Sequence, residues 1–218
     1  NLAFSDALKE CCRGKTVVDV GTGTGLLSVL AARSGATRIV ACERSFAMAE
    51  VARKTFEKHD AAVELRVGDS SEVITDEDAF DVAVAEVFDA ALFGEGALET
   101  LRQAHRVAQV IVPARATLCC AVVHDGRITV EPYDVVSLDA IPHDFVSNVA
   151  RFEDVLLLRD DADDLRHLGT RRLTRVAEGV ADAIVAWFEL DMLGDKRFVL
   201  STAPRNSRGP NVSYLATS

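Results

Sequence analysis

A glycine-rich turn beside an acidic residue is the first feature of this sequence that could do chemistry. Gly21, Gly23 and Gly25 follow a short Val-rich stretch and precede apolar residues at helical spacing. Glycine lets a strand-to-helix turn bring its backbone close to a ligand. Asp19 lies two residues before the first glycine, where its carboxylate would repel a pyrophosphate and attract an ammonium group. Leu26 takes the place of the third glycine of a dinucleotide fingerprint.

These residues favour S-adenosylmethionine over NAD as the ligand, because S-adenosylmethionine carries an α-ammonium group. Glu43 lies 24 residues after Asp19, at the end of the next expected strand, where an acid can accept both hydroxyls of a ribose. Asp69, Ser70 and Ser71 follow the third expected strand, where an adenine edge would lie. They could supply its hydrogen-bond partners, or they could form an ordinary turn that caps the strand.

A second pair of acids, Glu86 and Glu95, lies in a loop after the fourth expected strand, at the edge where open α/β sheets bind ligands. Gly94 and Gly96 flank the second acid, so the loop is expected to fold back and bring the two carboxylates together. Converging carboxylates need a cation between them. A guanidinium with five donors suits this role. An acid pair in a loop more often faces solvent, but behind a methyl-donor site it indicates arginine binding.

The elements that must position these residues alternate through the first half of the chain. We expect strands over 15–20, 38–43, 62–67, 81–86 and 109–112, and helices over 26–35, 45–59 and 97–107. This alternation predicts right-handed βαβ units and a parallel sheet, an α/β Rossmann-like domain over 1–113. From residue 114 the pattern predicts an antiparallel β module to 218, with one hairpin turn at Asp125–Gly126 and a second at Gly194–Asp195.

Composition narrows the classes of protein that fit. The chain has 218 residues, 49% apolar, which is enough for one large domain or two small ones. Its net charge of −10 disfavours direct binding of nucleic acid. We find no run of about 18 apolar residues for a membrane span and no signal peptide. The five cysteines lack metal-site spacing and form no disulfide framework, so we expect reduced thiols, no metal, and a cytoplasmic protein with the nucleus as a second compartment.

Three segments together resemble the protein arginine methyltransferases. Residues 17–43 resemble the family's S-adenosylmethionine motif and ribose-binding acid, and the Glu86–Glu95 loop is similar to its double-E loop. Residues 115–123 resemble the strand that opens the family's substrate-binding β-barrel. The resemblance is strong over 15–124 and thin over 125–204. The family's N-terminal helices and its Thr-His-Trp loop have no counterpart in this sequence, so we expect the chain to be shortened or to lack segments.

The resemblance implies a Rossmann-like domain, a β-barrel with a dimerisation arm at about 132–178, and a homodimer. It implies methyl transfer to arginine in proteins such as histone tails or RNA-binding proteins, leaving S-adenosylhomocysteine. Glu86 and Glu95 would hold the guanidinium. Phe88 and Asp89 stand where most of the family has Met and Gly, and they resemble the monomethylating type III branch. We expect them to crowd a methylated guanidinium and to favour basic neighbours of the arginine. Alternatively, Phe88 packs into the core and Asp89 caps the loop.

Two other functions remain open from the sequence. A small-molecule S-adenosylmethionine-dependent methyltransferase would need Asp19, Gly21 and Glu43 but not the second acid. A catalytically silent partner of an active homologue would fit the segments that the sequence lacks. The double-E loop argues against a silent partner, because such a protein has no need for two converging acids.

Overall fold

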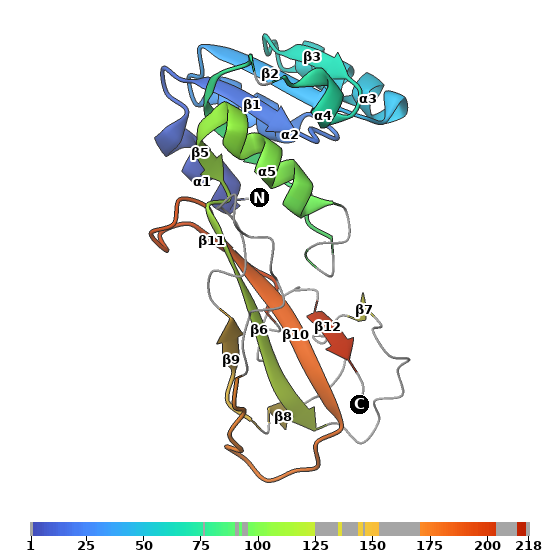
Figure 1. The fold of residues 1–218 in the computed structure, drawn as a ribbon, viewed down its shortest axis with the longest axis vertical. Coiled ribbons are helices and arrows are strands. Elements are labelled where there is room, and N and C mark those ends of the chain that lie inside the picture. The colour runs from blue at the N-terminus through green and yellow to red at the C-terminus, as the bar shows by residue number, and fades with distance from the viewer. Residues whose placement is uncertain are drawn as a thin grey trace.

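The computed structural model describes residues 2–75, 77–89, 92, 96–124, 135–136, 144–145, 147–152, 171–203 and 213–216. These residues form a parallel sheet with helices around it and a second, antiparallel sheet that extends away from it (Figure 1). Glu95, the expected turn at Asp125–Gly126 and most of the expected arm at 132–178 lie outside the described residues.

The first sheet is parallel throughout, as the alternation of strands and helices predicts. It contains β1 (Thr16–Val20), β2 (Arg38–Glu43), β3 (Glu64–Val67), β4 (Phe80–Ala85) and β5 (Ala108–Val112), in the order β3-β2-β1-β4-β5. The central strands β1, β2 and β4 are buried along most of their length, because both faces of such a sheet are covered. The strand order reverses between β1 and β4, so the loops that follow these two strands border a crevice.

Three of the helices were predicted from the sequence: α2 (Leu26–Arg33), α3 (Phe46–Lys58) and α5 (Ala97–Val107). Ser45 caps α3, where its Oγ accepts a hydrogen bond from the Met48 N–H at 3.4 Å. Gly35, with φ of +86°, follows the end of α2, as expected for a C-terminal stop.

The helix α1 (Leu2–Cys11) and the one-turn helix α4 (Ser70–Val73) were not predicted. Phe4, Ala7 and Leu8 of α1 are fully buried, and their spacing of three and four residues is a helical signal. The sequence alone indicated a turn in place of α4. Asp69 caps this helix, because its Oδ1 accepts a hydrogen bond from the Ser71 N–H at 3.0 Å.

The second sheet is antiparallel and is built on two long strands, β6 (Arg115–His124) and β10 (Ala183–Asp191). The hairpin predicted at Gly194–Asp195 is confirmed, since β11 (Val199–Ser201) pairs antiparallel with β10. Shorter strands complete the sheet: β7 (Val135–Val136), β8 (Asp144–Phe145), β9 (Ala150–Phe152) and β12 (Ser213–Ala216). The described strands do not close on themselves, so the barrel remains a prediction.

The two sheets meet around one hydrophobic core. The chain passes from β5 to β6 between Val112 and Arg115. Phe188, Leu190 and Met192, from β10 and the residue after it, belong to the same buried cluster as α1 and the parallel strands. Arg197, in the β10–β11 hairpin, also donates hydrogen bonds to both carboxylate oxygens of Glu10 in α1, at 2.7 and 2.5 Å. These contacts fix how the antiparallel sheet leaves the parallel one.

All five cysteines are free thiols, as expected from their spacing. Within the described ranges, no helix is both long and apolar enough to cross a membrane. The same residues contain no group of three or more His, Cys, Asp or Glu side chains arranged to hold a metal ion.

Candidate active site

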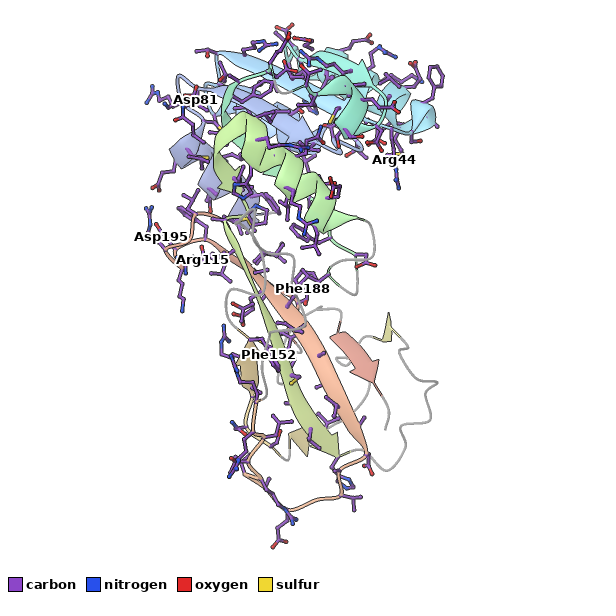
Figure 2. All side chains as sticks on the ribbon, viewed as in Figure 1. Arg44, Asp81, Arg115, Phe152, Phe188 and Asp195 are labelled. Carbon is purple, nitrogen blue, oxygen red and sulfur yellow. The ribbon has the colours of Figure 1, made fainter. Side chains whose placement is uncertain are left out.

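A cavity of about 590 Å³ lies at the carboxyl edge of the parallel sheet, a size typical of small-molecule sites. Its walls come from the loops after β1, β3 and β4, from the end of β2 and the start of α3, and from α2 and α5. Arg44, just past β2, borders this cavity, whereas Asp81 lies at the amino end of β4; Figure 2 shows these two residues at opposite ends of the sheet. Because the loops after β1 and β4 both border the cavity, it lies where the strand order of the sheet reverses.

Several residues predicted to bind a cofactor or an arginine line this cavity, and others do not. The lining includes seven of the predicted residues: Gly21, Gly23, Leu26, Glu43, Asp69, Ser70 and Glu86. Five other predicted residues lie outside it: Asp19, Gly25, Ser71, Phe88 and Asp89.

The glycines of the glycine-rich loop have positive φ angles, which residues with a side chain adopt only at a cost in free energy. Gly21 has φ of +74°, and a Cβ there would lie 2.9 Å from Cγ1 of Val87 in the loop after β4. Gly25 has φ of +85° and is the N-cap residue of α2, and a Cβ there would lie 2.6 Å from the ring of Phe56. The glycines therefore allow two close contacts: the loop after β4 packs on Gly21, and α3 packs on Gly25.

Asp19 lies beneath the loop rather than in the cavity wall. It is completely buried, and its Oδ2 accepts hydrogen bonds from the hydroxyls of Thr22 and Ser28, each at 2.6 Å. Burial raises the pKa of the Asp19 carboxyl above its usual range, although the two hydroxyls oppose this shift. Its Oδ1 is buried without a hydrogen-bond donor among the described residues. Because this acceptor lies behind the cavity wall, its role toward the ammonium group of a ligand stays a prediction.

Glu43 ends β2 and faces the cavity, where its carboxylate joins three segments. Its Oε2 accepts a hydrogen bond from the Gly23 N–H at 2.9 Å, and its Oε1 accepts one from the Ser45 N–H at 2.8 Å. A carboxylate oxygen can accept more than one hydrogen bond. Both oxygens thus retain capacity for the hydroxyls of a ribose, while their backbone contacts fix the side chain.

Asp69 and Ser70 line the cavity at the start of α4. The Ser71 hydroxyl donates a hydrogen bond to Asp69 Oδ1 at 2.7 Å. This bond, followed by that of the Ser71 N–H, lowers the pKa of Asp69 below its usual range. Ser71 itself is not part of the wall. Ser71 therefore holds the Asp69 carboxylate in place, while Asp69 and Ser70 line the cavity.

The acid loop after β4 contributes Glu86, which is exposed and lines the cavity, and Val87, which contacts Gly21. Phe88 is half-buried and packs against the main hydrophobic core. The Asp89 carbonyl accepts a hydrogen bond from the Leu92 N–H at 3.0 Å. Glu95 lies outside the described residues, so its approach to Glu86 remains a prediction.

Sequence reasoning missed other lining residues, among them Arg44, Met48 and Thr100. Arg44 follows the predicted ribose acid directly, and this adjacency could have indicated it. Met48 lies in the first turn of α3. Thr100 had no sequence signal, because it reaches the cavity from α5, whose position depends on how that helix packs.

Comparisons with known proteins agree with this geometry. Residues 17–114 match the family model described as "Methyltransferase domain". The arginine N(omega)-methyltransferase of Streptomyces achromogenes subsp. streptozoticus is 31% identical over 240 residues, covering 95% of this chain and 65% of that protein. Proteins named protein arginine N-methyltransferase 7, from Aedes aegypti, and 9, from Mus musculus, also match, and the chain covers 34% and 31% of them. The chain thus spans less than two thirds of these relatives.

Solved structures share the fold over almost the whole chain. Protein arginine methyltransferase 10 of Arabidopsis thaliana, in an open conformation, superposes with a TM-score of 0.78 at 20% identity, covering 99% of this chain and 78% of that one. The Trypanosoma brucei PRMT1 enzyme–prozyme heterotetrameric complex with AdoHcy gives a TM-score of 0.75 at 20% identity, covering 99% and 77%. The fold is therefore that of these enzymes, and the family resemblance found in the sequence is confirmed.

Proposed function

We propose that this relative of the protein arginine methyltransferases transfers a methyl group from S-adenosylmethionine to a guanidinium nitrogen of arginine. The observation that carries the proposal is the cavity at the reversal point of the sheet. It brings the glycine-rich loop, Glu43 and Glu86 to one place, with a candidate cofactor site and a candidate arginine site side by side.

The residues present fit S-adenosylmethionine, which when bound supplies an electrophilic methyl group on its sulfonium. Glu43 accepts hydrogen bonds from the ribose hydroxyls. Asp69 and Ser70 offer polar atoms at the adenine side, and the unpartnered Oδ1 of Asp19 suits the ammonium group. The similar fold of the Trypanosoma brucei complex with AdoHcy supports the same ligand class.

On the acceptor side, Glu86 and Glu95 hold the guanidinium through charge-assisted hydrogen bonds. A carboxylate that localises the positive charge on one nitrogen leaves lone-pair density on another, which becomes the nucleophile. Holding that nitrogen in line with the methyl group removes much of the entropic barrier. The N–CH3 bond would form as the bond from the methyl group to the sulfonium sulfur breaks, which leaves S-adenosylhomocysteine, and the nitrogen would lose one proton to a carboxylate or to solvent. In this mechanism the acids orient and polarise the arginine, and no covalent enzyme intermediate is needed.

We further propose that the product is monomethylarginine only. The support is the sequence of the acid loop and its packing, since Val87 contacts Gly21 and Phe88 is anchored against the core. These contacts tie the acid loop to the glycine-rich loop, which restricts the room for a nitrogen that already carries a methyl group. Asp89 adds a carboxylate that favours arginines with basic neighbours.

The central test is to incubate the full-length protein with S-adenosylmethionine and an Arg-rich peptide and to identify products by mass spectrometry. We expect monomethylarginine from the wild-type protein and at least about a 100-fold loss of rate in Glu86→Gln, the range for removing a stabilising group from a transition state. Retained binding of S-adenosylhomocysteine by this variant shows that its cofactor site is intact. Dimethylarginine after long incubation would contradict the monomethylation proposal, and full activity of Glu86→Gln would contradict the mechanism.

Free arginine is a second candidate acceptor, because the name of the Streptomyces relative specifies arginine rather than a protein. The same assay separates the two acceptors when L-arginine and an Arg-rich peptide are supplied at equal concentration. Methylated free arginine with an unmodified peptide would assign the chain to small-molecule methylation. The reverse result supports a protein substrate such as a histone tail or an RNA-binding protein.

The wider architecture completes the proposal: an S-adenosylmethionine-binding domain over 1–113 and a β-barrel domain over 114–218 with a dimerisation arm near 132–178. We propose a homodimer located in the cytoplasm and also the nucleus. The heterotetrameric Trypanosoma brucei complex shows that this fold assembles in a similar protein. Light scattering of the full-length protein at micromolar concentration tests the dimer, and a monomeric mass refutes it. Cell fractionation tests the location.

A further inference from the structure

Gln103 is a buried polar residue of α5 that connects this helix to the wall of the cavity. It is 5% exposed, and its Nε2 donates hydrogen bonds to two backbone carbonyls, that of Ser70 at 2.5 Å and that of Ile74 at 3.0 Å. Both acceptors belong to the α4 segment, which begins with Ser70 and is capped at its end by Ile74. One side chain therefore holds both ends of α4.

The segment α4 needs this support because it is too short to be stable alone. It has four residues, and its helical hydrogen bonds run from the Val73 N–H to Asp69 and from the Ile74 N–H to Ser70. A buried carbonyl that loses its donor costs free energy. Without Gln103, the Ser70 carbonyl would retain one donor, and the Ile74 carbonyl would lose the donor that the structure gives it.

The position of α4 matters because Asp69 and Ser70 form part of the cavity wall. The helix α5 reaches the same cavity directly through Thr100, three residues before Gln103 and on the same face of the helix. Gly96, the N-cap residue of α5, follows the acid loop directly. Gln103 thus stands between the segment beside the expected adenine site and the helix that follows the expected arginine site.

We propose that Gln103 is a positioning residue for the cofactor: it sets the affinity for S-adenosylmethionine by holding the Asp69–Ser70 wall through the Ser70 carbonyl. The inference rests on the proposed function, since it takes this cavity as the cofactor site. It predicts an effect on cofactor binding that is larger than the effect on arginine binding or on the methyl-transfer step.

The test measures the dissociation constant of S-adenosylhomocysteine by calorimetry in the full chain, together with KM for an Arg-rich peptide at saturating cofactor. Gln103→Leu keeps the volume of the side chain and removes both hydrogen bonds. We expect its dissociation constant to rise about tenfold, equivalent to about 1.4 kcal/mol, while the peptide KM and kcat change less than about twofold. Val107→Ala is the matched control, because Val107 is buried on the same helix and belongs to the main core. It should lower Tm without changing cofactor affinity.

A second variant separates positioning from general stability. In Gln103→Glu, a carboxylate faces two carbonyl oxygens and is repelled, whereas the protonated acid donates one hydrogen bond. Its dissociation constant relative to wild type should therefore fall as the pH is lowered from about 8.5 to about 6, because burial raises the pKa of such a carboxyl. This pH series decides the question even if Gln103→Leu does not fold.

An affinity in folded Gln103→Leu within twofold of wild type would overturn the inference, as would an equal loss in Val107→Ala. The inference would also be overturned if the dissociation constant of S-adenosylhomocysteine for Gln103→Glu, divided by that for wild type, did not change with pH. A wild-type protein that does not bind S-adenosylhomocysteine overturns the proposed function together with the inference. Binding by wild type with unaffected Gln103 variants overturns the inference alone.

Discussion

Replacing Glu43 by alanine tests the candidate cofactor site most directly. The side chain joins the glycine-rich loop to the start of α3, because its two oxygens accept hydrogen bonds from the Gly23 and Ser45 N–H groups at 2.9 and 2.8 Å. It also lines the cavity, where we propose that it binds ribose hydroxyls. Glu43→Ala removes the ligand contact and loosens the loop at the same time.

The expected loss follows from the kind of hydrogen bond involved. A hydrogen bond to a charged group contributes about 1.5 to 3 kcal/mol. Losing one such contact with the ligand should raise the dissociation constant of S-adenosylhomocysteine by about 10- to 150-fold. The dissociation constant for Glu43→Gln should lie between those for Glu43→Ala and wild type, since the amide keeps one oxygen acceptor and loses the charge.

Titration calorimetry of the full chain measures this change, and Glu64→Ala is the matched control. Glu64 lies on the neighbouring strand β3, where its carboxylate accepts hydrogen bonds from Arg38 and Arg66 at 3.1 and 2.8 Å. It does not line the cavity. Its loss should leave the affinity unchanged. If Glu43→Ala binds within twofold of wild type, the ribose assignment is refuted. If Glu64→Ala weakens binding equally, the loss of affinity comes from a general disturbance of the sheet and not from the loss of a ligand contact.

Three further predictions concern the loop, the buried acid and the thiols. Gly25→Ala should cost about 2 to 4 kcal/mol of unfolding free energy, because its Cβ would overlap an aromatic ring 2.6 Å away. Gly23→Ala, with φ of +55° and only the Gly21 carbonyl oxygen 4.0 Å from the added Cβ, should cost only about 1 to 2 kcal/mol of backbone strain. Denaturant unfolding in which Gly23→Ala loses more stability than Gly25→Ala would contradict the geometry. Burial raises the pKa of Asp19, so its ionised form destabilises the fold and protonation restores stability as the pH falls through that pKa. Asp19→Asn should therefore raise Tm most at alkaline pH, and an equal gain at about pH 5 and about pH 9 would refute the burial argument. Cys11 is half-buried and a neighbouring thiol lowers its pKa, whereas burial raises the pKa of Cys42 to about 11; peptide mapping after brief alkylation should find Cys11 modified first.

The parallel sheet and its ligand-binding edge follow from local patterns in the sequence. Buried Val-rich runs such as 16–20 alternate with helical spacing, and a chain of this kind packs its strands in parallel with their carboxyl ends along one edge. That rule alone brings Gly21, Glu43 and Asp69 together, because each lies just at or after the end of a strand. The short helix α4 and the helix α1 were missed, although the buried face of α1 carried a helical signal.

The tertiary structure decided which way these side chains face and what holds them. Asp19 lies beneath the loop because Thr22 and Ser28, three and nine residues away, converge on one of its oxygens only after α2 packs on β1. Phe88 packs against the core and does not line the cavity, so its place beside an arginine stays a prediction.

Long-range contacts explain what the sequence could not reveal. Gln103 meets Ser70 across 33 residues of sequence, and Thr100 reaches the cavity from the same helix. Sequence spacing encodes which residues share a strand end or a helix face, since those relations depend on local backbone geometry. Contacts between separate elements depend on how buried faces pack together, and only the folded chain establishes that packing.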